Sequence, residues 1–246
     1  MVYNDYRKNI WSEFMNFNDI ANEYAYKTEL HAHTSPVSLC ADFSPEDVMA
    51  TYAAAGVNSV VITNHLTPDW IGKSADEYID DFYRAKVAGE RLGVNAILGV
   101  EIRFTENHND YLVYGVKDSD VSAMIEHLED GIHLFYKDFK REDNLIIQAH
   151  PFRKHIVAIE PCDIDGYESF NLHPGHNSGV GSSARLVRET GKLSTCGTDY
   201  HHRNHEAMAL LRTKNELFDS DDVARAIASR DVLFDVWGHL IYPYGT

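Results

Sequence analysis

Histidines and carboxylates occur in this sequence at spacings that suit a metal centre. His31 and His33 are separated by one residue, so on a β-strand their imidazoles point to the same side. Asp199 and His201 repeat this spacing much later in the chain. Zinc, manganese and iron all accept imidazole nitrogens and carboxylate oxygens as ligands. The spacing predicts that each pair offers two ligands to a divalent metal, the alternative being surface residues that share a strand face by chance.

Three more candidate ligands each stand at the end of an apolar, strand-like run: His65, Glu101 and His150. Glu101 directly follows the apolar run 96–100, so we expect its carboxylate to be buried. A buried carboxylate must be ion-paired, protonated or bound to a cation. With histidines at neighbouring strand ends, metal binding is the favoured interpretation.

Short apolar runs alternate with longer helical patterns from residue 26 onwards, which predicts an α/β fold. We expect strands near 26–33, 59–64, 95–104, 111–115, 145–150, 166–171, 193–198 and 232–236. We expect helices at 45–56 and 74–93, and one or two helices within 118–143. In a barrel of parallel strands all carboxyl ends open on one face, so the candidate ligands would converge there.

The length of 246 residues, without a Ser- or Gly-rich linker, favours one domain. We predict a single α/β barrel over residues 1–246. In this barrel 1–25 form an N-terminal extension, 26–202 carry the ligand motifs, and 219–246 supply a C-terminal helix and strand.

The composition limits the partners that we expect. The chain has 38 acidic and 22 basic residues and a net charge of −16, which repels a phosphate backbone and argues against long nucleic acid as a partner. Three scattered cysteines make no disulfide framework. The sequence has neither a signal-peptide pattern nor an apolar run of about 20 residues. We therefore expect a cytoplasmic protein with no membrane partner.

Five short motifs resemble those of the PHP family, the polymerase and histidinol phosphatase superfamily. In chain order they are ELHAHT at 29–34, VITNH at 61–65, GVE at 99–101, AHP at 149–151 and GTDYH at 197–201. The resemblance implies a distorted seven-stranded βα barrel of the TIM-like type. It also implies two or three divalent metal ions at the C-terminal face of the barrel, and hydrolysis of phosphate esters.

The resemblance further implies how the first two metals share their ligands. The first metal would take four residues: His31, His33, Glu101 and Asp199. Glu101 would bridge to a second metal, which His150 also binds. Asp110 is the favoured additional ligand near Glu101, and His108 is the alternative.

The third metal would take His65, His201 and one residue from the loop after the first strand. Family members place His, Asp or Glu in that loop, whereas this sequence offers Cys40 or Asp42. Asn64 also departs from the family, which usually has Asp before this histidine. An asparagine can still orient His65 through a hydrogen bond, but it carries no charge to make that imidazole more basic.

Two neighbouring divalent metals would activate water and neutralise phosphoryl oxygens, so no protein nucleophile is needed. The residues assigned to catalysis are Glu101, Asp199 and His201. The groups expected to hold the phosphate or the rest of the substrate are Arg103, Arg153, His173 and His176. His173 and His202 are candidates for protonating the leaving oxygen.

These features predict a metal-dependent phosphoesterase that acts on the phosphomonoester of a small metabolite. A nucleotide phosphatase or an exonuclease-like phosphodiesterase is the alternative within the class. A metal-binding regulatory barrel without turnover is a second alternative, because of the departures at Asn64 and Cys40. Hydrolysis of a C–N bond on an amidohydrolase-like barrel is a third, and the lack of a lysine at a strand end argues against it. The sequence predicts no oligomeric state.

Overall fold

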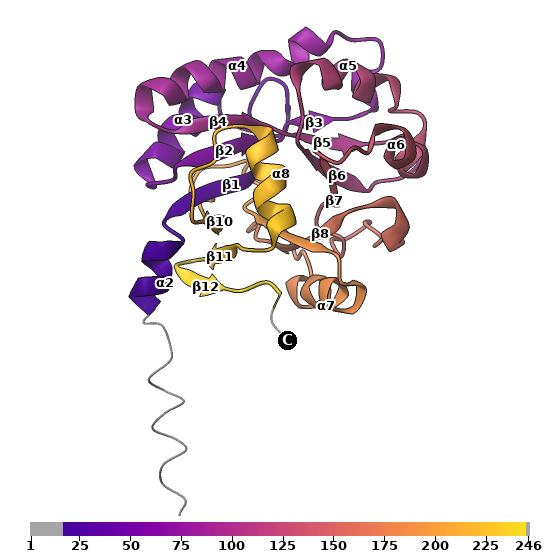
Figure 1. Ribbon diagram of the computed structural model, residues 1–246. Helices are drawn as coiled ribbons and strands as arrows, with labels where there is room; N and C mark the ends of the chain where they lie inside the picture. The colour runs from indigo at the N-terminus through magenta and orange to yellow at the C-terminus, as the bar shows by residue number, and fades with distance from the viewer. Residues whose placement is uncertain (1–16, 245–246) are drawn as a thin grey trace, which may run out of the picture.

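Two mixed β-sheets lie at the centre of the computed structural model, which describes residues 17–244 (Figure 1). The strands are β1 Tyr26–Ala32, β2 Ser59–Ile62, β3 His65–Leu66, β4 Asn95–Leu98, β5 Val100–Arg103, β6 Asp110–Tyr114, β7 Leu145–Gln148, β8 Gly166–Asn171, β9 Leu193–Gly197, β10 Ala209–Thr213, β11 Leu233–Val236 and β12 His239–Ile241. One six-stranded sheet has the order β12-β11-β10-β1-β2-β4, and the other has the order β3-β5-β6-β7-β8-β9.

The helices surround these strands (Figure 1). They are α2 Phe17–Glu23, α3 Pro45–Ala54, α4 Ala75–Leu92, α5 Asp118–Glu126, α6 Gly131–Phe139, α7 Val180–Thr190 and α8 Ser220–Ser229, with short 3-10 helices η1 Pro68–Trp70 and η2 Pro161–Asp163. Each predicted strand region contains a strand, and the predicted helices appear as α3, α4, the pair α5 and α6, and the C-terminal α8. The sequence analysis missed the helices α2 and α7 and the strands β3, β10 and β12. The predicted extension 1–25 contains α2 and ends directly before β1, and its residues 1–16 lie outside the described part of the chain.

Local sequence explains where the two predicted helices begin and end. Ser44 caps α3 by accepting a hydrogen bond from the Asp47 backbone N–H at 3.2 Å, and Pro45 occupies the first helical position. Gly93 ends α4 in the left-handed region, with φ 72. These two helices pack against each other on one side of the strands, above β2 and β4 in Figure 1.

At two places the chain passes directly from one sheet into the other. β2 and β4 pair in the first sheet, and the residues that follow them, β3 and β5, pair in the second. Gly99 lies between β4 and β5, where an added Cβ would come within 2.6 Å of Val61 Cγ1. At another margin of the sheets, β1 and β9 approach through a bridge between Ala32 and Tyr200.

The prediction of a seven-stranded parallel barrel is confirmed only as a mixed α/β fold. Within residues 17–244 the strands form two mixed sheets, and no single closed ring of seven parallel strands is defined. β6 runs antiparallel to both of its neighbours, and β10 runs antiparallel to β1. The reversal of β6 has a consequence for the site, because its first residue, Asp110, lies beside Arg103 near the carboxyl end of β5.

An apolar core fills the interior between the sheets. It contains Leu30, Val61, Ile97, Leu112 and Ile147, each from a different strand. The segment before α8 covers the beginnings of β2 and β4, because the Leu217 carbonyl accepts hydrogen bonds from Ser59 (2.8 Å) and Asn95 (3.2 Å). A second core lies under the outer helices.

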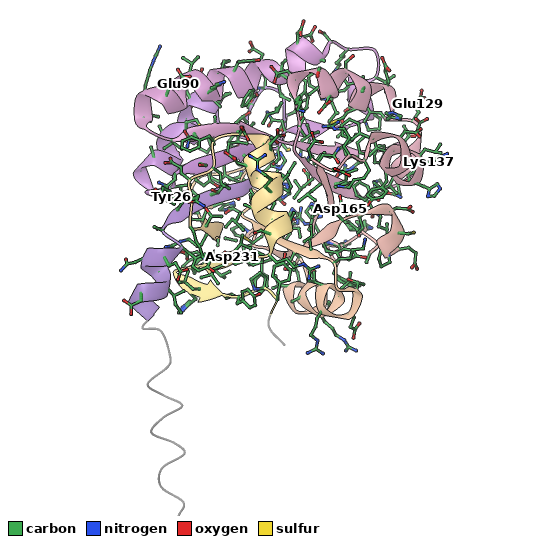
Figure 2. All side chains as sticks on the ribbon, viewed as in Figure 1. Tyr26, Glu90, Glu129, Lys137, Asp165 and Asp231 are labelled. Carbon is green, nitrogen blue, oxygen red and sulfur yellow. The ribbon has the colours of Figure 1, made fainter. Side chains whose placement is uncertain are left out.

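The outer surface carries charged side chains. Glu90, Glu129 and Lys137 lie at the periphery of the molecule in Figure 2 and are exposed. Among the described residues, no helix combines the length and the apolar character needed to cross a membrane.

Candidate metal centre

Residues from both sheets meet where several strands end. His31 lies in β1, His65 begins β3 and Glu101 lies in β5, while His150 follows β7 and Asp199 follows β9. All but His65 are almost completely buried. The fold therefore brings together side chains that are up to 168 positions apart in the chain (199 − 31).

Glu101 stands at the centre of this cluster. Its Oε1 lies 3.3 Å from His31 Nε2 and 3.2 Å from His150 Nε2, and its Oε2 lies 3.4 Å from His33 Nε2 and 2.8 Å from His65 Nδ1. Burial raises the pKa of Glu101, but the positive charge of the histidines outweighs burial and holds this pKa well below its usual range. One ionised carboxylate thus faces four imidazoles.

Asp199 faces the same group of rings from the end of β9. Its Oδ1 lies 3.5 Å from His31 Nε2, 3.3 Å from His33 Nε2 and 3.2 Å from His201 Nδ1. Asp199 adopts φ 55, and His150 adopts φ 30. Backbone in this sparsely populated region is typical of functional sites, where the surrounding structure enforces it.

His31, His33 and Glu101 form a first group of donor atoms close enough together to hold a metal ion, and a second such ligand group combines Glu101, His150 and Asp110. Asp110 receives two hydrogen bonds of 2.7 Å from the Arg103 guanidinium, which fix its carboxylate. His108, the alternative to Asp110, is exposed and belongs to none of the three ligand groups found among the described residues. The structure therefore places Asp110, and not His108, next to Glu101 and His150.

A third group combines His33, His65 and His201. Cys40 lines the same cavity as His65 and His201. Burial raises the pKa of the Cys40 thiol, but the two imidazoles beside it lower this pKa to about 6 overall. Asp42, the alternative ligand, instead forms an ion pair of 2.7 Å with His202 and is exposed.

Four buried atoms of this cluster, among the described residues, form no hydrogen bond: His31 Nε2, His33 Nε2, Glu101 Oε2 and His150 Nδ1. The first three have charged neighbours within 3.5 Å, as given above, but these contacts lack hydrogen-bond geometry. Leaving a buried polar atom unpaired costs about 1–3 kcal/mol. Each of the three ligand groups has its donor atoms within 4.8 Å of one another, and two of the groups share Glu101. The donor set and the unpaired atoms fit two or three divalent cations.

A buried glutamate that the sequence analysis missed supports these ligands. Glu168 Oε1 lies 2.9 Å from His31 Nδ1, and its Oε2 accepts hydrogen bonds from the His150 backbone N–H and the Asn171 side chain, both at 3.0 Å. A carboxylate that holds the second nitrogen of a ligating histidine fixes its tautomer and orientation. The signal in the sequence was an acidic residue inside the buried strand GYESFN, at 166–171.

Asn64 has a different role from the predicted one. Its side chain does not hydrogen-bond to the His65 ring but accepts from the Thr34 backbone N–H at 2.7 Å and from Ser38 Oγ at 2.8 Å. Ser38 Oγ in turn accepts from the His65 backbone N–H at 2.9 Å. Asn64 therefore holds the loop after β1 in place and acts on His65 only through Ser38.

The predicted substrate-binding residues line a cavity of about 250 Å³ above the cluster, and they are Arg103, Arg153, His173 and His176. The guanidinium of Arg153 contacts Asp199 Oδ2, just as Arg103 holds Asp110. Both arginines thus position candidate ligands in addition to facing the cavity. His173 packs near His176 and His201, and burial lowers its pKa to about 4.

Known proteins resemble this chain in sequence and in fold. No family model matches the chain. It is 26% identical over 222 residues to the PolC-type DNA polymerase III of Streptococcus sanguinis, an alignment that covers 89% of this chain and 13% of the polymerase. The chain therefore spans only a small part of that curated relative.

Two solved structures share the fold. A two-domain protein from Bacteroides vulgatus containing a predicted PHP-like metal-dependent phosphoesterase matches with a TM-score of 0.57 and 12% identity, over 86% of this chain and 64% of that one. An amidohydrolase from Chromobacterium violaceum, with bound sulfate and no metal, matches with a TM-score of 0.51 and 12% identity, over 73% of this chain and 89% of that one. The resemblance to the PHP family that the five motifs indicate is confirmed at the level of the fold, and the chain has a PHP-like architecture.

Proposed function

We propose that this protein is a metal-dependent phosphoesterase that hydrolyses phosphomonoesters of small metabolites. The observation that carries the proposal is the buried Glu101 carboxylate, which joins two of three adjoining ligand groups beneath one cavity. The neighbour from Bacteroides vulgatus contains a predicted phosphoesterase, and the neighbour from Chromobacterium violaceum binds sulfate, a tetrahedral anion shaped like phosphate.

The ligand groups assign residues to three cations. The first would be held by His31, His33, Glu101 and Asp199, the second by Glu101, Asp110 and His150, and the third by His65, His201 and Cys40. Zinc, manganese and iron suit this donor set. When bound, such ions supply Lewis acidity and an activated water for attack on phosphorus.

Residues of the chain hold the ligands and orient the substrate. Arg153 donates to Asn171 at 2.8 Å and to Asp199, while its buried Nε has no partner. Arg153 also lines the cavity, where its guanidinium would contact a phosphoryl oxygen of the substrate. His202 lines the same cavity and uses Nδ1 to contact Asp42, which leaves Nε2 to protonate the departing oxygen. The low pKa of buried His173 makes it the weaker candidate for this acid.

Two observations favour a phosphoesterase of small substrates over the alternatives. Within the described residues, the lining of the metal cavity contains no lysine of the kind that bridges metals in many amidohydrolases. The net charge of −16 opposes a long nucleic acid but not a single phosphate held by Arg153 and cations.

The test combines metal analysis with a hydrolysis screen. Purified protein is loaded separately with zinc, manganese and iron, and assayed on phosphomonoesters, phosphodiesters, short single-stranded oligonucleotides and amide substrates. We expect two to three metal equivalents and the highest kcat/KM on a small phosphomonoester. Preference for oligonucleotides would support the phosphodiesterase, and metal binding without any turnover would support the regulatory barrel.

A further inference from the structure

A second and larger cavity, of about 500 Å³, adjoins the candidate metal centre. It shares Cys40 and His65 with the metal cavity, so a molecule bound at the metals can extend into it. The other lining residues come from the loop after β1, from the segment between β3 and α4, and from the first turn of α4, and they include Leu39, Asp69, Trp70, Lys73 and Glu77. No step of the proposed hydrolysis uses this space.

The wall of this cavity is apolar and fixed. Trp70 ends η1 and packs edge-on against Tyr78 of α4, with ring centroids 5.2 Å apart. Tyr78 is itself fixed by a hydrogen bond from its hydroxyl to the Asn64 carbonyl. A wall of this kind keeps its shape, so ligand binding there costs little ordering of side chains.

Leu39 stands at the edge of the cavity and is 89% exposed, the highest value among the large exposed hydrophobic residues described. It directly precedes Cys40 and therefore lies close to the metal ligands in the chain. An exposed leucine beside an apolar cavity is a surface that gains from being covered. A ligand spanning from the metals to Trp70 would cover it.

The metal cavity adjoins two other cavities, and the residues that line these two cavities differ in charge. The Trp70 cavity has two carboxylates, Asp69 and Glu77, and one ammonium group, Lys73, which lies 5.0 Å from the Trp70 ring centroid. The other cavity that adjoins the metal cavity, of about 330 Å³, is lined by Arg103, Arg153 and Lys154 and by one carboxylate, Asp110. An anionic group is therefore favoured on the arginine side, and an uncharged group on the Trp70 side.

We propose that the Trp70 cavity binds the leaving alcohol of the substrate, and that this alcohol carries an uncharged, apolar group about the size of a ring. The proposal rests on the proposed phosphoesterase function, and it adds the substrate class. Leu39 and Trp70 then determine specificity: they contact the part of the substrate that departs and do not touch the reacting phosphorus.

The kinetic test compares 2-phenylethyl phosphate with ethyl phosphate, two esters whose leaving alcohols have similar acidity. We expect the metal-loaded protein to prefer the phenylethyl ester by about 30-fold in kcat/KM, from burial of the ring. Leu39→Ser should lower this preference about fivefold, mainly by raising KM, because contacts remote from phosphorus hold substrate and transition state alike.

Controls separate this proposal from the proposed function. Leu134→Ser makes the same change at an exposed position of α6 and should leave the preference unchanged. Trp70→Phe keeps an aromatic wall and should lower the preference less than Leu39→Ser if the wall survives. Equal hydrolysis of both esters by the wild-type protein, or equal behaviour of Leu39→Ser and Leu134→Ser, would overturn the cavity assignment and leave the phosphoesterase intact.

A binding measurement decides the case in which no phosphate ester is hydrolysed. In metal-free protein carrying Trp11→Phe and Trp237→Phe, Trp70 is the remaining tryptophan of three. Titration with 4-nitrobenzyl alcohol, a quencher of indole fluorescence, should give saturable quenching that Leu39→Ser weakens and Leu134→Ser does not. Purely linear, collisional quenching in all three proteins would refute an apolar binding site, whatever the reaction.

Discussion

One face of β6 carries two kinds of buried environment within five residues. Asp110, Leu112 and Tyr114 are every second residue of the strand, so their side chains point to the same side of the sheet. Leu112 and Tyr114 lie in the apolar core between the sheets, whereas Asp110 lies with Glu101 and His150. The apolar layer is complete without a ligand, while the polar layer contains buried atoms without hydrogen-bond partners. We infer that the apolar layer, which contains Leu112 and Tyr114, stabilises the fold. The polar layer, in which Asp110 lies with Glu101 and His150, contains unpaired buried atoms that lower stability in the absence of cations.

The largest effect is expected from Glu101→Gln in the polar layer. The neutral amide removes the negative charge that faces four imidazoles, so bound metal should fall and kcat/KM should drop by at least about 1000-fold. The metal-free variant should be less stable than the metal-free wild type, because the amide no longer offsets the positive charge of the histidines that face Glu101. Metal analysis, the phosphatase assay and thermal unfolding check this. Full metal content with full activity would show that Glu101 is not a ligand.

Leu112→Ala should differ from Glu101→Gln, because it should lower stability and leave metal binding unchanged. Truncating this fully buried leucine leaves a cavity in the apolar layer and should lower the free energy of unfolding by about 2–5 kcal/mol. Metal stoichiometry at low temperature should stay unchanged, since the ligands of the polar layer remain. Urea unfolding and metal analysis measure the two quantities. If Leu112→Ala loses metal as readily as Glu101→Gln, the two layers do not act separately.

Removing metal should destabilise the polar layer reversibly. Cations that bind the folded chain stabilise it by about 2.7 kcal/mol for each site at a concentration 100 times Kd. We therefore expect chelation by EDTA to lower Tm and restored zinc or manganese to raise it. The same treatment of Glu101→Gln serves as the control and should shift Tm much less. An unchanged wild-type Tm would contradict the assignment of the unpaired atoms to cation binding.

Glu168→Gln tests the support beneath the polar layer. Because Glu168 holds His31 Nδ1 and the His150 backbone, this variant should weaken metal binding by about 10–100-fold while keeping the number of sites. Glu189→Gln changes an exposed glutamate of α7 and is the matched control. Titration with a competing chelator measures the affinity. Equal affinities in the two variants would make Glu168 a structural residue only.

The smallest effect concerns the third cation. Cys40→Ser should remove or weaken one metal equivalent, whereas Asp42→Ala should leave the metal content unchanged, because Asp42 pairs with His202 away from the ligand groups. Alkylation of Cys40 should also slow when metal is present. Loss of one equivalent in Asp42→Ala alone would reverse this choice.

Much of the candidate site was predictable because its signals are local. The alternation of His31 and His33, and a carboxylate such as Glu101 directly after an apolar run, follow from residue types and spacing within a few positions. The helix beginning at Ser44 and Pro45 follows from capping chemistry in the same way. Local spacing could not reveal Glu168, since a glutamate within a strand gives no indication of which histidine it will face.

The sequence by itself determined which residue types stand at the strand ends and which family the motifs resemble. The tertiary structure decided that the strands form two mixed sheets and that reversed β6 brings Asp110 to Glu101. It also decided that Cys40 lies beside His65 and His201, whereas Asp42 pairs with His202. The physical reason is that strand direction and loop path depend on contacts between distant segments, which pack to bury apolar surface and satisfy backbone hydrogen bonds across the whole fold. The alternation of apolar and polar residues in the sequence indicates only which face of a strand is buried.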